Sequence, residues 1–489
     1  MIETLVRSKR EMDMVCDRHK LEQINEAALT ILDTVGVRIL GESHRTFLAE
    51  KGIRIQGRRA FFSPDETREM IAKAPASFTL HGIDPDKTID IGTGKSKIAA
   101  AYGCSRIMEP GGTVRATNLA DHATLVKLVH QSDALHLNGG ILAQPSDMDS
   151  DKSHLAMHYT TLIHSDKCIM GIGCNKNRME DIMLLSAIRL GGNDVLRRTP
   201  RVMTMVASFS PLQVDAMALE AIEAAAKYNQ PVMCSPGVAT GTTGPIDLPS
   251  NLAMATAEAL AMIVITQIYN PGNPVIFGLQ CYGADMVTGN ISIGSPAYAL
   301  QAKYTAALAR FYDLPSRCGG ATNDAKSLSP QAGYESMLSI FTAMQNQTSL
   351  ILHGAGILDS FACISIEKFI MDLEMIKMSR FYLDDIRIDE DSLNVDQIRQ
   401  VGPGGLFLTN PDTLKKCRTH SWTPRVALRG GLKGMDPDSR FMQKIAAEQN
   451  RMLSTYKAPE IDSEIVKEMN RFMTRKGLDP DTLPLKPKT

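Results

Sequence analysis

Residues 202–234 read VMTMVASFSPLQVDAMALEAIEAAAKYNQPVMC, and this stretch contains the unit that decides the fold. A short apolar run, 202–207, is followed by a longer segment, 212–229, in which apolar residues recur on one face at helical spacing. Ser210-Pro211 predicts the start of that helix, with the serine as N-cap and the proline in the first turn. A second apolar run, 231–234, ends the stretch. Strand, helix and strand in this order predict two parallel strands joined by a crossover helix.

The same alternation repeats from about residue 96 to residue 361. We expect eight strands, at 97–102, 135–142, 168–172, 202–207, 231–234, 274–279, 315–318 and 350–352. We expect helices between them, at 118–131, 151–165, 177–190, 212–229, 250–270, 296–313 and 330–347. Pro110-Gly111-Gly112 predicts a hairpin inserted after the first strand. Eight such repeats over about 260 residues are typical of a closed (β/α)8 TIM barrel, so the predicted fold class is α/β.

The chain continues beyond this barrel on both sides. Residues 1–95 predict an N-terminal α+β lobe, mostly helical, with helices over 19–35 and after Ser63-Pro64. Residues 362–489 are polar with helical periodicity and predict a C-terminal helical extension. The barrel, residues 96–361, is therefore expected to carry the active site.

Composition and charge exclude several classes of protein. Lys and Arg (53) nearly balance Asp and Glu (54) over 489 residues, and this gives no electrostatic footprint for nucleic acid or an anionic membrane surface. The N-terminus is charged throughout and lacks the apolar core of a signal peptide. The most apolar stretch, 252–268, contains Glu258 and Gln267 and predicts a buried helix. The nine cysteines include no CxxC pair and predict free thiols in a cytoplasmic protein.

In such barrels the active site lies at the carboxyl ends of the strands. The segments that follow the predicted strands carry small polar residues and little charge, which suits a net-neutral substrate better than a polyphosphate. Gln280, Asn323 and Asp324 are the expected polar contacts to a substrate, and Asp324 is the only carboxylate in these segments.

Three aromatic residues, Tyr102, Phe209 and Tyr282, follow predicted strands as well. Aromatic faces attract a quaternary ammonium group through cation–π interactions, so these residues are candidates for a box around such a group. Packing in the core is the alternative role for each, and we expect at least one of the three to line the pocket.

His353 follows the last predicted strand, in the segment LILHGAGILDS (350–360). Gly354 and Gly356 let backbone N–H groups approach a ligand closely, so an anion could lie against those dipoles and the imidazole. The alternative is a histidine that is hydrogen-bonded to a neighbouring loop.

Several cysteines also fall near strand ends, and three converging thiolates could bind zinc. No two of them form a tight ligand pair, so we interpret them as small buried apolar residues and predict no metal site. These residues are Cys104, Cys174, Cys234, Cys281 and Cys318.

Five motifs together resemble the trimethylamine methyltransferase superfamily. They are ILDTVGVRILGE (31–42), KAPASFTLHGIDP (73–85), TNLADHATLVKLV (117–129), NDAKSLSPQAGYE (323–335) and SIEKFIMDLEM (365–375). The resemblance covers residues from about 20 to 460. The five motifs are specific together, whereas each alone is weak. It implies a (β/α)8 barrel that moves a methyl group from an amine to the cob(I)amide of a small corrinoid-binding protein. The transfer converts this cob(I)amide into methylcobamide.

The founding members of that superfamily carry pyrrolysine, whereas segment 319–324 of this chain is uninterrupted and contains standard residues only. The chain is therefore similar to the non-pyrrolysine branch, whose characterised members demethylate quaternary amines. Glycine betaine, giving dimethylglycine, is the expected substrate, and proline betaine and carnitine are the alternatives. The resemblance implies no tightly bound cofactor, and no nucleic-acid or membrane partner is expected. A homo-oligomer is left open.

The chemistry of quaternary amines agrees with the sparse charge of the predicted site. A quaternary ammonium leaves as a neutral amine, so no catalytic acid is required and only positioning and desolvation are expected. Because the positive charge fades in the transition state, a very strong cation site would stabilise the substrate more than the transition state. The carboxylate of a betaine keeps its charge and is the better handle, with His353 as its expected contact.

Two other functions stay open on the sequence alone. One is a zinc-dependent methyltransferase barrel, which stoichiometric zinc held by cysteines would indicate. The other is a non-catalytic betaine-binding protein, which binding of a betaine without methylcobalamin formation would indicate.

Overall fold

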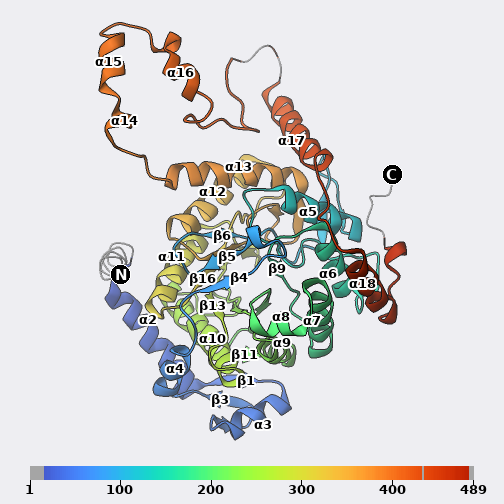
Figure 1. The fold of residues 1–489 in the computed structure, drawn as a ribbon. Coiled ribbons are helices and arrows are strands. Elements are labelled where there is room, and N and C mark those ends of the chain that lie inside the picture. Colours follow the sequence, from blue (N-terminus) through green and yellow to red (C-terminus); the bar gives the residue numbers. More distant parts are fainter. Residues whose placement is uncertain (1–15, 432–433, 435, 484–489) are drawn as a thin grey trace.

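A curled parallel sheet forms the centre of the molecule (Figure 1). The computed structural model describes residues 16–431, 434 and 436–483. Seven strands pair in parallel in the order β6-β17-β16-β13-β12-β10-β9. Their bounds are β6 Lys97–Ile98, β9 Ile169–Met170, β10 Val202–Val206, β12 Val232–Cys234, β13 Val275–Gly278, β16 Ser316–Gly319 and β17 Leu350–Leu352. Each lies in one of the predicted runs, except that β16 extends one residue beyond its run, to Gly319.

The remaining predicted strand, 135–142, is reduced to one paired position. Leu137 forms isolated parallel bridges to Ala99, next to β6, and to Cys168, next to β9. Since β6 and β9 are the two edges of the seven-stranded sheet, this residue brings both edges together.

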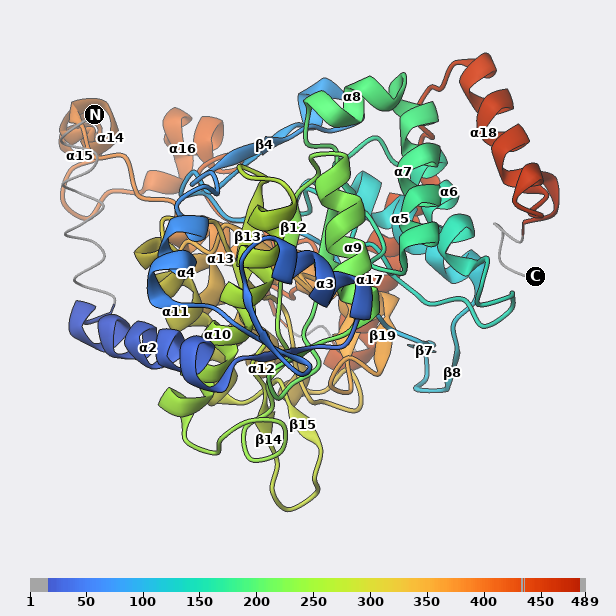
Figure 2. The same ribbon diagram turned by 90° about the horizontal axis from the view of Figure 1, so that it is seen from below.

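Helices alternate with these strands and cover the outside of the sheet (Figure 2). Their bounds are α5 Leu119–Gln131, α6 Ser153–His164, α7 Lys176–Leu190, α8 Asn193–Arg198, α9 Ala216–Lys227, α10 Leu248–Tyr269, α11 Pro296–Phe311 and α12 Pro330–Gln345. All except the short α8 lie within a few residues of a predicted helix. Side-chain caps fix the first residue of several of these helices. At the start of α5, for example, the Asn118 side chain accepts a hydrogen bond from the N–H of Asp121.

The helix start predicted at Ser210-Pro211 is wrong. Helix α9 begins at Ala216, where the Asp215 side chain caps it. Two serine hydroxyls and one backbone N–H of the loop 208–212 donate instead to the carboxylate of Glu258, a fully buried residue of α10. This carboxylate therefore holds the loop after β10 in a non-helical path.

Helix α10 is the one helix of the described residues that is long and apolar enough to cross a membrane. However, 89% of its apolar window is buried inside the protein. It packs against α2 (Arg18–Thr30), α4 (Pro64–Ile71) and α9. This burial confirms the buried helix predicted over 252–268.

A hairpin of β4 (Phe78–Leu80) and β5 (Ile89–Ile91) fills the amino-terminal end of the curled sheet. Its four apolar side chains belong to one buried cluster with inward-facing residues of the central strands, among them Met170, Met203 and Leu350. The hairpin therefore closes that end of the sheet with apolar side chains.

The other N-terminal elements share their core with the sheet and its helices. They are α2, a π-helical segment Ile31–Val35, β1 Val37–Ile39, α3 Glu42–Glu50, β2 Arg54–Gln56, β3 Arg59–Phe61 and α4. Strand β11 (Gln213–Val214), from the loop before α9, pairs in parallel with β1. The Ser63 cap is confirmed, since Ser63 and Glu66 form a reciprocal capping box.

Three small β elements surround the carboxyl ends of the strands. The hairpin predicted at Pro110 is present as β7 (Arg106–Met108) and β8 (Val114–Ala116). Strands β18 (Ile357–Leu358) and β19 (Cys363–Ser365) follow β17, and β19 pairs with β7. Strands β14 (Gly283–Ala284) and β15 (Ile291–Ser292) form a second hairpin, which projects from this end of the molecule (Figure 2).

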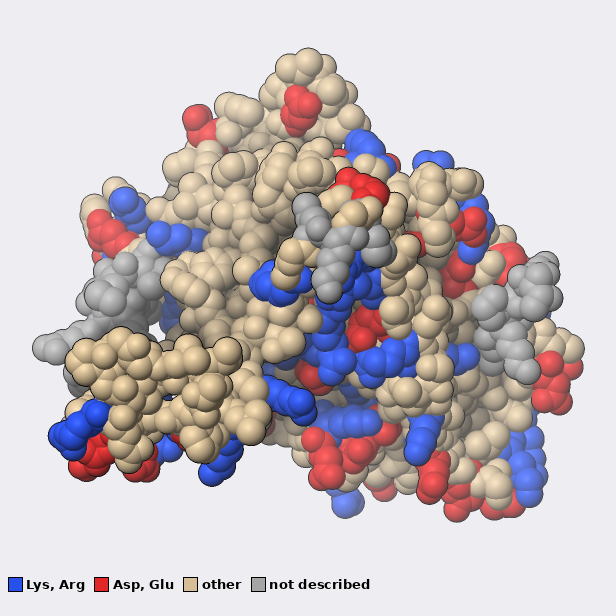
Figure 3. All heavy atoms as spheres, turned by 90° about the horizontal axis from the view of Figure 1, so that it is seen from above, with Lys and Arg blue, Asp and Glu red and all other residues tan. Residues whose placement is uncertain are grey.

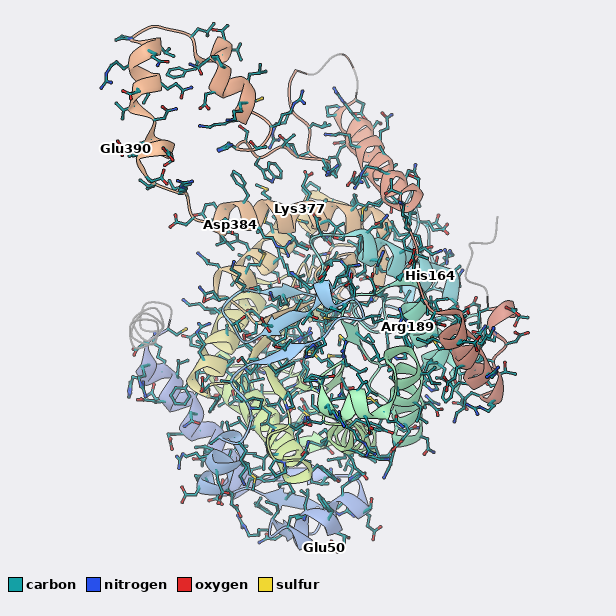
Figure 4. The ribbon with its side chains drawn as sticks, in the orientation of Figure 1. Glu50, His164, Arg189, Lys377, Asp384 and Glu390 are labelled. Atoms are coloured by element: carbon teal, nitrogen blue, oxygen red, sulfur yellow. The ribbon has the colours of Figure 1, made fainter. Side chains whose placement is uncertain are left out.

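The C-terminal part contains several helices and includes a projecting arm. Helix α13 (Ile366–Leu383) packs on α12, and α17 (Pro437–Ser454) and α18 (Ser463–Arg475) return to the body. Between them, residues 384–416 form the arm, which contains α14 Glu390–Leu393, α15 Val395–Val401 and α16 Pro411–Lys416. Figure 4 marks Asp384 at the end of α13 and Glu390 on the arm, away from the body.

Candidate active site

Tyr102 and Phe209 line one cavity at the carboxyl ends of the strands. The cavity measures about 270 Å³ and also touches Cys174, Met205 and Ser208. Phe209 is 66% exposed at its rim, whereas Tyr102 is largely buried. Burial raises the pKa of Tyr102 to about 12, so its phenol is neutral at physiological pH. Two of the three predicted aromatic residues are thus brought together.

Tyr282 lies in a second group of polar and aromatic side chains around the buried Arg317. We call this group the Arg317 cluster. Its members are Ser235, Gln280, Tyr282, Tyr298, Arg317, His353 and Phe361, which are connected by hydrogen bonds, ring contacts and electrostatic interactions.

Arg317 points into the interior of the sheet from β16. The next residue, Cys318, contacts the Ala302 carbonyl of α11 on the outside of the sheet, and successive strand residues face opposite sides. Arg317 is 1% exposed, and its Nη1 donates to the Ser235 hydroxyl at 3.0 Å. Among the residues that the structure describes, its electrostatic neighbours are Tyr298, Tyr282 and Cys318, and no carboxylate pairs with it.

Three buried polar atoms of the cluster have no hydrogen-bond partner. They are Arg317 Nε, His353 Nδ1 and Gln280 Oε1. The other end of the Gln280 amide donates to the Tyr298 hydroxyl at 3.2 Å. Buried polar atoms are nearly always paired in proteins, so three unpaired atoms in one cluster call for a specific explanation.

His353 lies against an aromatic wall. Its ring centroid is 4.5 Å from that of Phe361, and the Phe361 and Tyr282 rings meet edge-on at 6.0 Å. Burial, and then the neighbouring charge of Arg317, hold the pKa of His353 well below its usual range. The imidazole is therefore neutral at physiological pH and supplies no positive charge for an anion.

Phe361 reaches this wall through an unusual backbone turn. Asp359, Ser360 and Phe361 adopt φ angles of 51°, 50° and 73°, and His353 has a φ of 61°. The left-handed region costs about 1–2 kcal/mol for each residue other than glycine. Strain of this kind persists where the surrounding structure enforces it, and it concentrates at functional sites.

Asp324 and Asn323 hold that turn in place. The Asp324 carboxylate accepts from the Ser360 hydroxyl at 2.7 Å and from three donors of segment 292–294. The Asn323 amide donates to the Ser336 hydroxyl and to the Ile357 carbonyl. The polar groups of both residues are thus hydrogen-bonded within the protein, and these bonds hold the turn that carries Phe361.

The glycine-rich segment after His353 does not offer the expected N–H groups. The N–H of Gly354 donates to the Ala99 carbonyl at 2.9 Å, and that of Gly356 donates to the Asp372 carboxylate at 2.8 Å. The N–H of His353 itself bonds to the Ala100 carbonyl. These three N–H groups are used within the protein, so they are not available to an anion, and the binding role predicted for His353, Gly354 and Gly356 stays a prediction.

The strand-end cysteines are buried thiols. Burial raises the pKa of Cys174 to about 12 and that of Cys318 to about 11, and it raises the other three further. Across residues 16–431, 434 and 436–483, no group of three or more His, Cys, Asp or Glu side chains is arranged to hold a metal ion.

Sequence reasoning missed Arg317 and Phe361 for different reasons. Arg317 lies one residue before the end of its predicted strand, whereas the rule for barrel active sites selects residues beyond the strand ends. A charged residue inside an apolar strand was nevertheless a usable signal. Phe361 lies in a loop whose left-handed turn has no sequence signature, since none of its three residues is a glycine.

Comparison with known sequences connects this architecture to one family. The sequence model of the trimethylamine methyltransferase (MTTB) family matches residues 1–479. A glycine betaine methyltransferase of Desulfitobacterium hafniense (strain Y51) is 36% identical over 459 residues, which cover 94% of this chain and 96% of that protein. An L-carnitine:corrinoid methyltransferase of Eubacterium limosum is 27% identical over 413 residues, which cover 81% of this chain and 83% of that protein.

A solved structure is similar in fold. The hydroxylamine complex of MtmB superposes with a TM-score of 0.52 at 11% identity, covering 90% of this chain and 88% of its own. At that identity the match concerns the fold only.

Proposed function

The chain belongs to the trimethylamine methyltransferase family, whose members are corrinoid-dependent methyltransferases, and from this premise we propose its reaction. It transfers one methyl group from a quaternary amine, in the first place glycine betaine, to the cob(I)amide of a partner corrinoid protein. The products are methylcobamide and dimethylglycine. The 36% identity to a glycine betaine methyltransferase supports this choice of substrate.

The aromatic wall of Tyr282, Phe361 and His353 is the observation that carries the proposal. The protein maintains three consecutive strained residues to keep Phe361 against His353. Aromatic faces attract a quaternary ammonium, and a single wall attracts it less strongly than a closed box would. A moderate cation site is what the reaction needs, because the charge on nitrogen disappears in the transition state.

The residues of the cluster supply positioning and exclusion of water rather than proton transfer. The leaving dimethylamino group is neutral, so the electron pair of the broken C–N bond remains on nitrogen without an acid. The acceptor supplies the electron pair that forms the new bond to carbon, and no oxidant or reductant is consumed. The largely buried surroundings of the wall favour this step by removing water from around the substrate.

The rim of this end of the molecule suits a large apolar acceptor. Five apolar side chains are at least half exposed there: Phe209, Met217, Ile246, Met286 and Val287. Met286 and Val287 lie at the tip of the β14–β15 hairpin. A corrin carried by a partner protein would dock against such a rim, directly over the substrate.

We propose that residues 96–361 form a complete (β/α)8 barrel whose second strand is the segment around Leu137. The bridges of Leu137 to both sheet edges support this closure. Residues 1–95 and 362–489 are then the N-terminal lobe and the C-terminal helical extension. We expect the enzyme in the cytoplasm, although residues 1–15, which bear on that expectation, lie outside the described part.

A homo-oligomer is the proposed state of the protein, and the arm supports it. Eight of the arm's large apolar residues are more than half exposed. They are Ile386, Ile388, Leu393, Val395, Ile398, Leu406, Leu408 and Leu414. Figure 3 shows one face of the arm, at the lower left, which is mostly free of charged side chains and has acidic and basic groups along its outer edge. Light scattering at several concentrations tests this assignment.

The proposed reaction is tested with free cob(I)alamin as the acceptor. The purified protein is mixed with reduced cobalamin and glycine betaine, and the Co(I) absorption band is followed while dimethylglycine is quantified. Loss of the band with one dimethylglycine per methylcobalamin is the expected result. Proline betaine, carnitine and trimethylamine serve as comparison substrates. No response to any quaternary amine would reject the proposal, and zinc-dependent activity or binding without methyl transfer would favour the alternatives.

A further inference from the structure

We propose that Arg317, and not His353, binds the carboxylate of the substrate, and that the enzyme is therefore selective for quaternary amines that carry a carboxylate. This inference rests on the proposed function and specifies its substrate class. It replaces the carboxylate contact that the sequence suggested with a residue from inside strand β16.

The hydrogen bonding of Arg317 is incomplete in a way that a carboxylate would correct. A guanidinium has five N–H donors in a planar fork, and the one hydrogen bond of Arg317 within the described residues goes to Ser235. Its Nε is buried without a partner. Two parallel N–H···O bonds to a carboxylate are the strongest pairing available to such a fork.

The charge of Arg317 is also uncompensated. Burying a cation without a counter-ion is costly, and apolar residues of similar volume are often more stabilising even than a buried ion pair. The neighbouring tyrosines do not supply the missing negative charge. Burial raises the pKa of Tyr282 to about 12 and that of Tyr298 further, so both phenols stay protonated. A cation retained under these conditions points to an anionic ligand.

The position of Arg317 matches the two ends of a betaine. The guanidinium lies close to two parts of the wall, since its charge acts on both His353 and Tyr282, and His353 in turn contacts the ring of Phe361. The carboxylate and the ammonium of glycine betaine are separated by a single methylene group, so both could be held at once. The unpaired His353 Nδ1 and Gln280 Oε1 lie in the same cluster and are available for polar contacts.

The same cation would disfavour substrates without a carboxylate. A trimethylammonium group placed near an unpaired guanidinium is repelled, and the repulsion is strong in a buried site. Choline and tetramethylammonium would meet this repulsion in full, whereas a betaine would neutralise it. Selectivity would then come from a repulsive element as well as an attractive one.

The test compares glycine betaine, choline and acetate as ligands, because they carry both charged groups, the ammonium alone and the carboxylate alone. Binding is measured by calorimetry for the wild-type protein, Arg317→Met, Arg317→Lys and His353→Gln. Arg310→Met, which removes a largely buried arginine from α11 on the outside of the sheet, is the matched control. The ratio of betaine to choline affinity within each protein does not depend on the fraction that is folded.

We expect Arg317→Met to lower this ratio about 100-fold, in the range found when one partner of a buried charge pair is removed. Arg317→Lys should restore part of the ratio, because lysine returns the positive charge but not the planar set of guanidinium donors. His353→Gln should weaken betaine and choline alike, because it alters the wall that both contact, and should leave the ratio within about threefold of wild type. Arg310→Met should change neither affinity. Wild-type betaine affinity should be constant from pH 6 to 9, because a guanidinium stays charged throughout.

Two outcomes overturn the inference without touching the proposed reaction. One is an unchanged ratio in Arg317→Met while the wild type still demethylates glycine betaine. The other is betaine affinity that falls as the pH rises through 6–7, which would assign the role to a protonated His353. If no quaternary amine binds but acetate binds the wild type and not Arg317→Met, the carboxylate site stands and the proposed reaction fails.

Discussion

Replacing His154 by leucine should make the protein more resistant to acid. His154 lies on α6 and is 5% exposed, and neither of its ring nitrogens has a hydrogen-bond partner. Burial, with the nearby charge of Arg178, lowers its pKa to about 4. His122 and His158 are also buried, on α5 and α6, with pKa values of about 4 and about 3.

These values determine the direction of the pH dependence. An unfolded histidine takes up a proton below about pH 6.5, whereas native His154 remains neutral down to about pH 4. Between these limits the unfolded chain binds more protons, so stability is lost as the pH falls. At pH 5, 1.5 units below the unfolded pKa, each such histidine costs about 2 kcal/mol, since one unit is about 1.4 kcal/mol. The three together cost about 6 kcal/mol, comparable with the total stability of many domains.

The measurement is urea unfolding, followed by circular dichroism, at pH 7.5, 6.0 and 5.0 and at one protein concentration. His154→Leu should be within about 1 kcal/mol of wild type at pH 7.5, because it removes a polar group that has no partner. At pH 5.0 it should be more stable than wild type by about 2 kcal/mol. His420→Leu, at an exposed position, is the control and should follow wild type. If His154→Leu and wild type lose stability in parallel as the pH falls, the buried neutral state assigned to His154 is wrong.

Three further substitutions test the site itself, and a fourth, Gly333→Ala, is a control outside it. Gly319→Ala should lower the unfolding free energy by about 1–3 kcal/mol, since the new Cβ would lie 1.9 Å from the Tyr298 hydroxyl. Gly333→Ala, in helix α12 with nothing within 4 Å of its Cβ, should instead stabilise by about 0.5–1 kcal/mol in the same urea experiment. Phe361→Leu should weaken glycine betaine and choline alike, by about 2- to 30-fold in calorimetry, and a loss confined to betaine would contradict the aromatic wall. Asp324→Asn should weaken both ligands and speed amide exchange at 359–361, whereas normal exchange with lost binding would make Asp324 a direct contact.

The regular part of the fold could be predicted because it repeats. Apolar runs and helical periodicity gave seven strands and their helices within a few residues, and the match to the trimethylamine methyltransferase family confirmed the resemblance. The failure at Ser210-Pro211 has a tertiary cause. Serine before proline is a good helix signal, but the carboxylate of Glu258, 48 residues away from Ser210, binds this loop instead.

The site was less predictable because its residues are defined by what surrounds them. Asn323 and Asp324 are polar and follow a strand, yet their partners Ile357 and Ser360 lie more than 30 residues further along the chain, and only folding brings them close. Whether Arg317 has a counter-ion is likewise decided by strands far apart in the sequence. The aromatic wall depends on backbone angles at 359–361 that no residue type in that turn prefers.

The β4–β5 hairpin bears on the kinetics of turnover. Apolar side chains fill the amino-terminal end of the sheet. In the proposed reaction, small molecules and the methyl acceptor would therefore share the opposite end. Betaine must then enter before the acceptor protein arrives, and dimethylglycine can diffuse away only after that protein has left. Steady-state rates should follow a compulsory order, and a large excess of the acceptor protein should slow the enzyme by trapping its product.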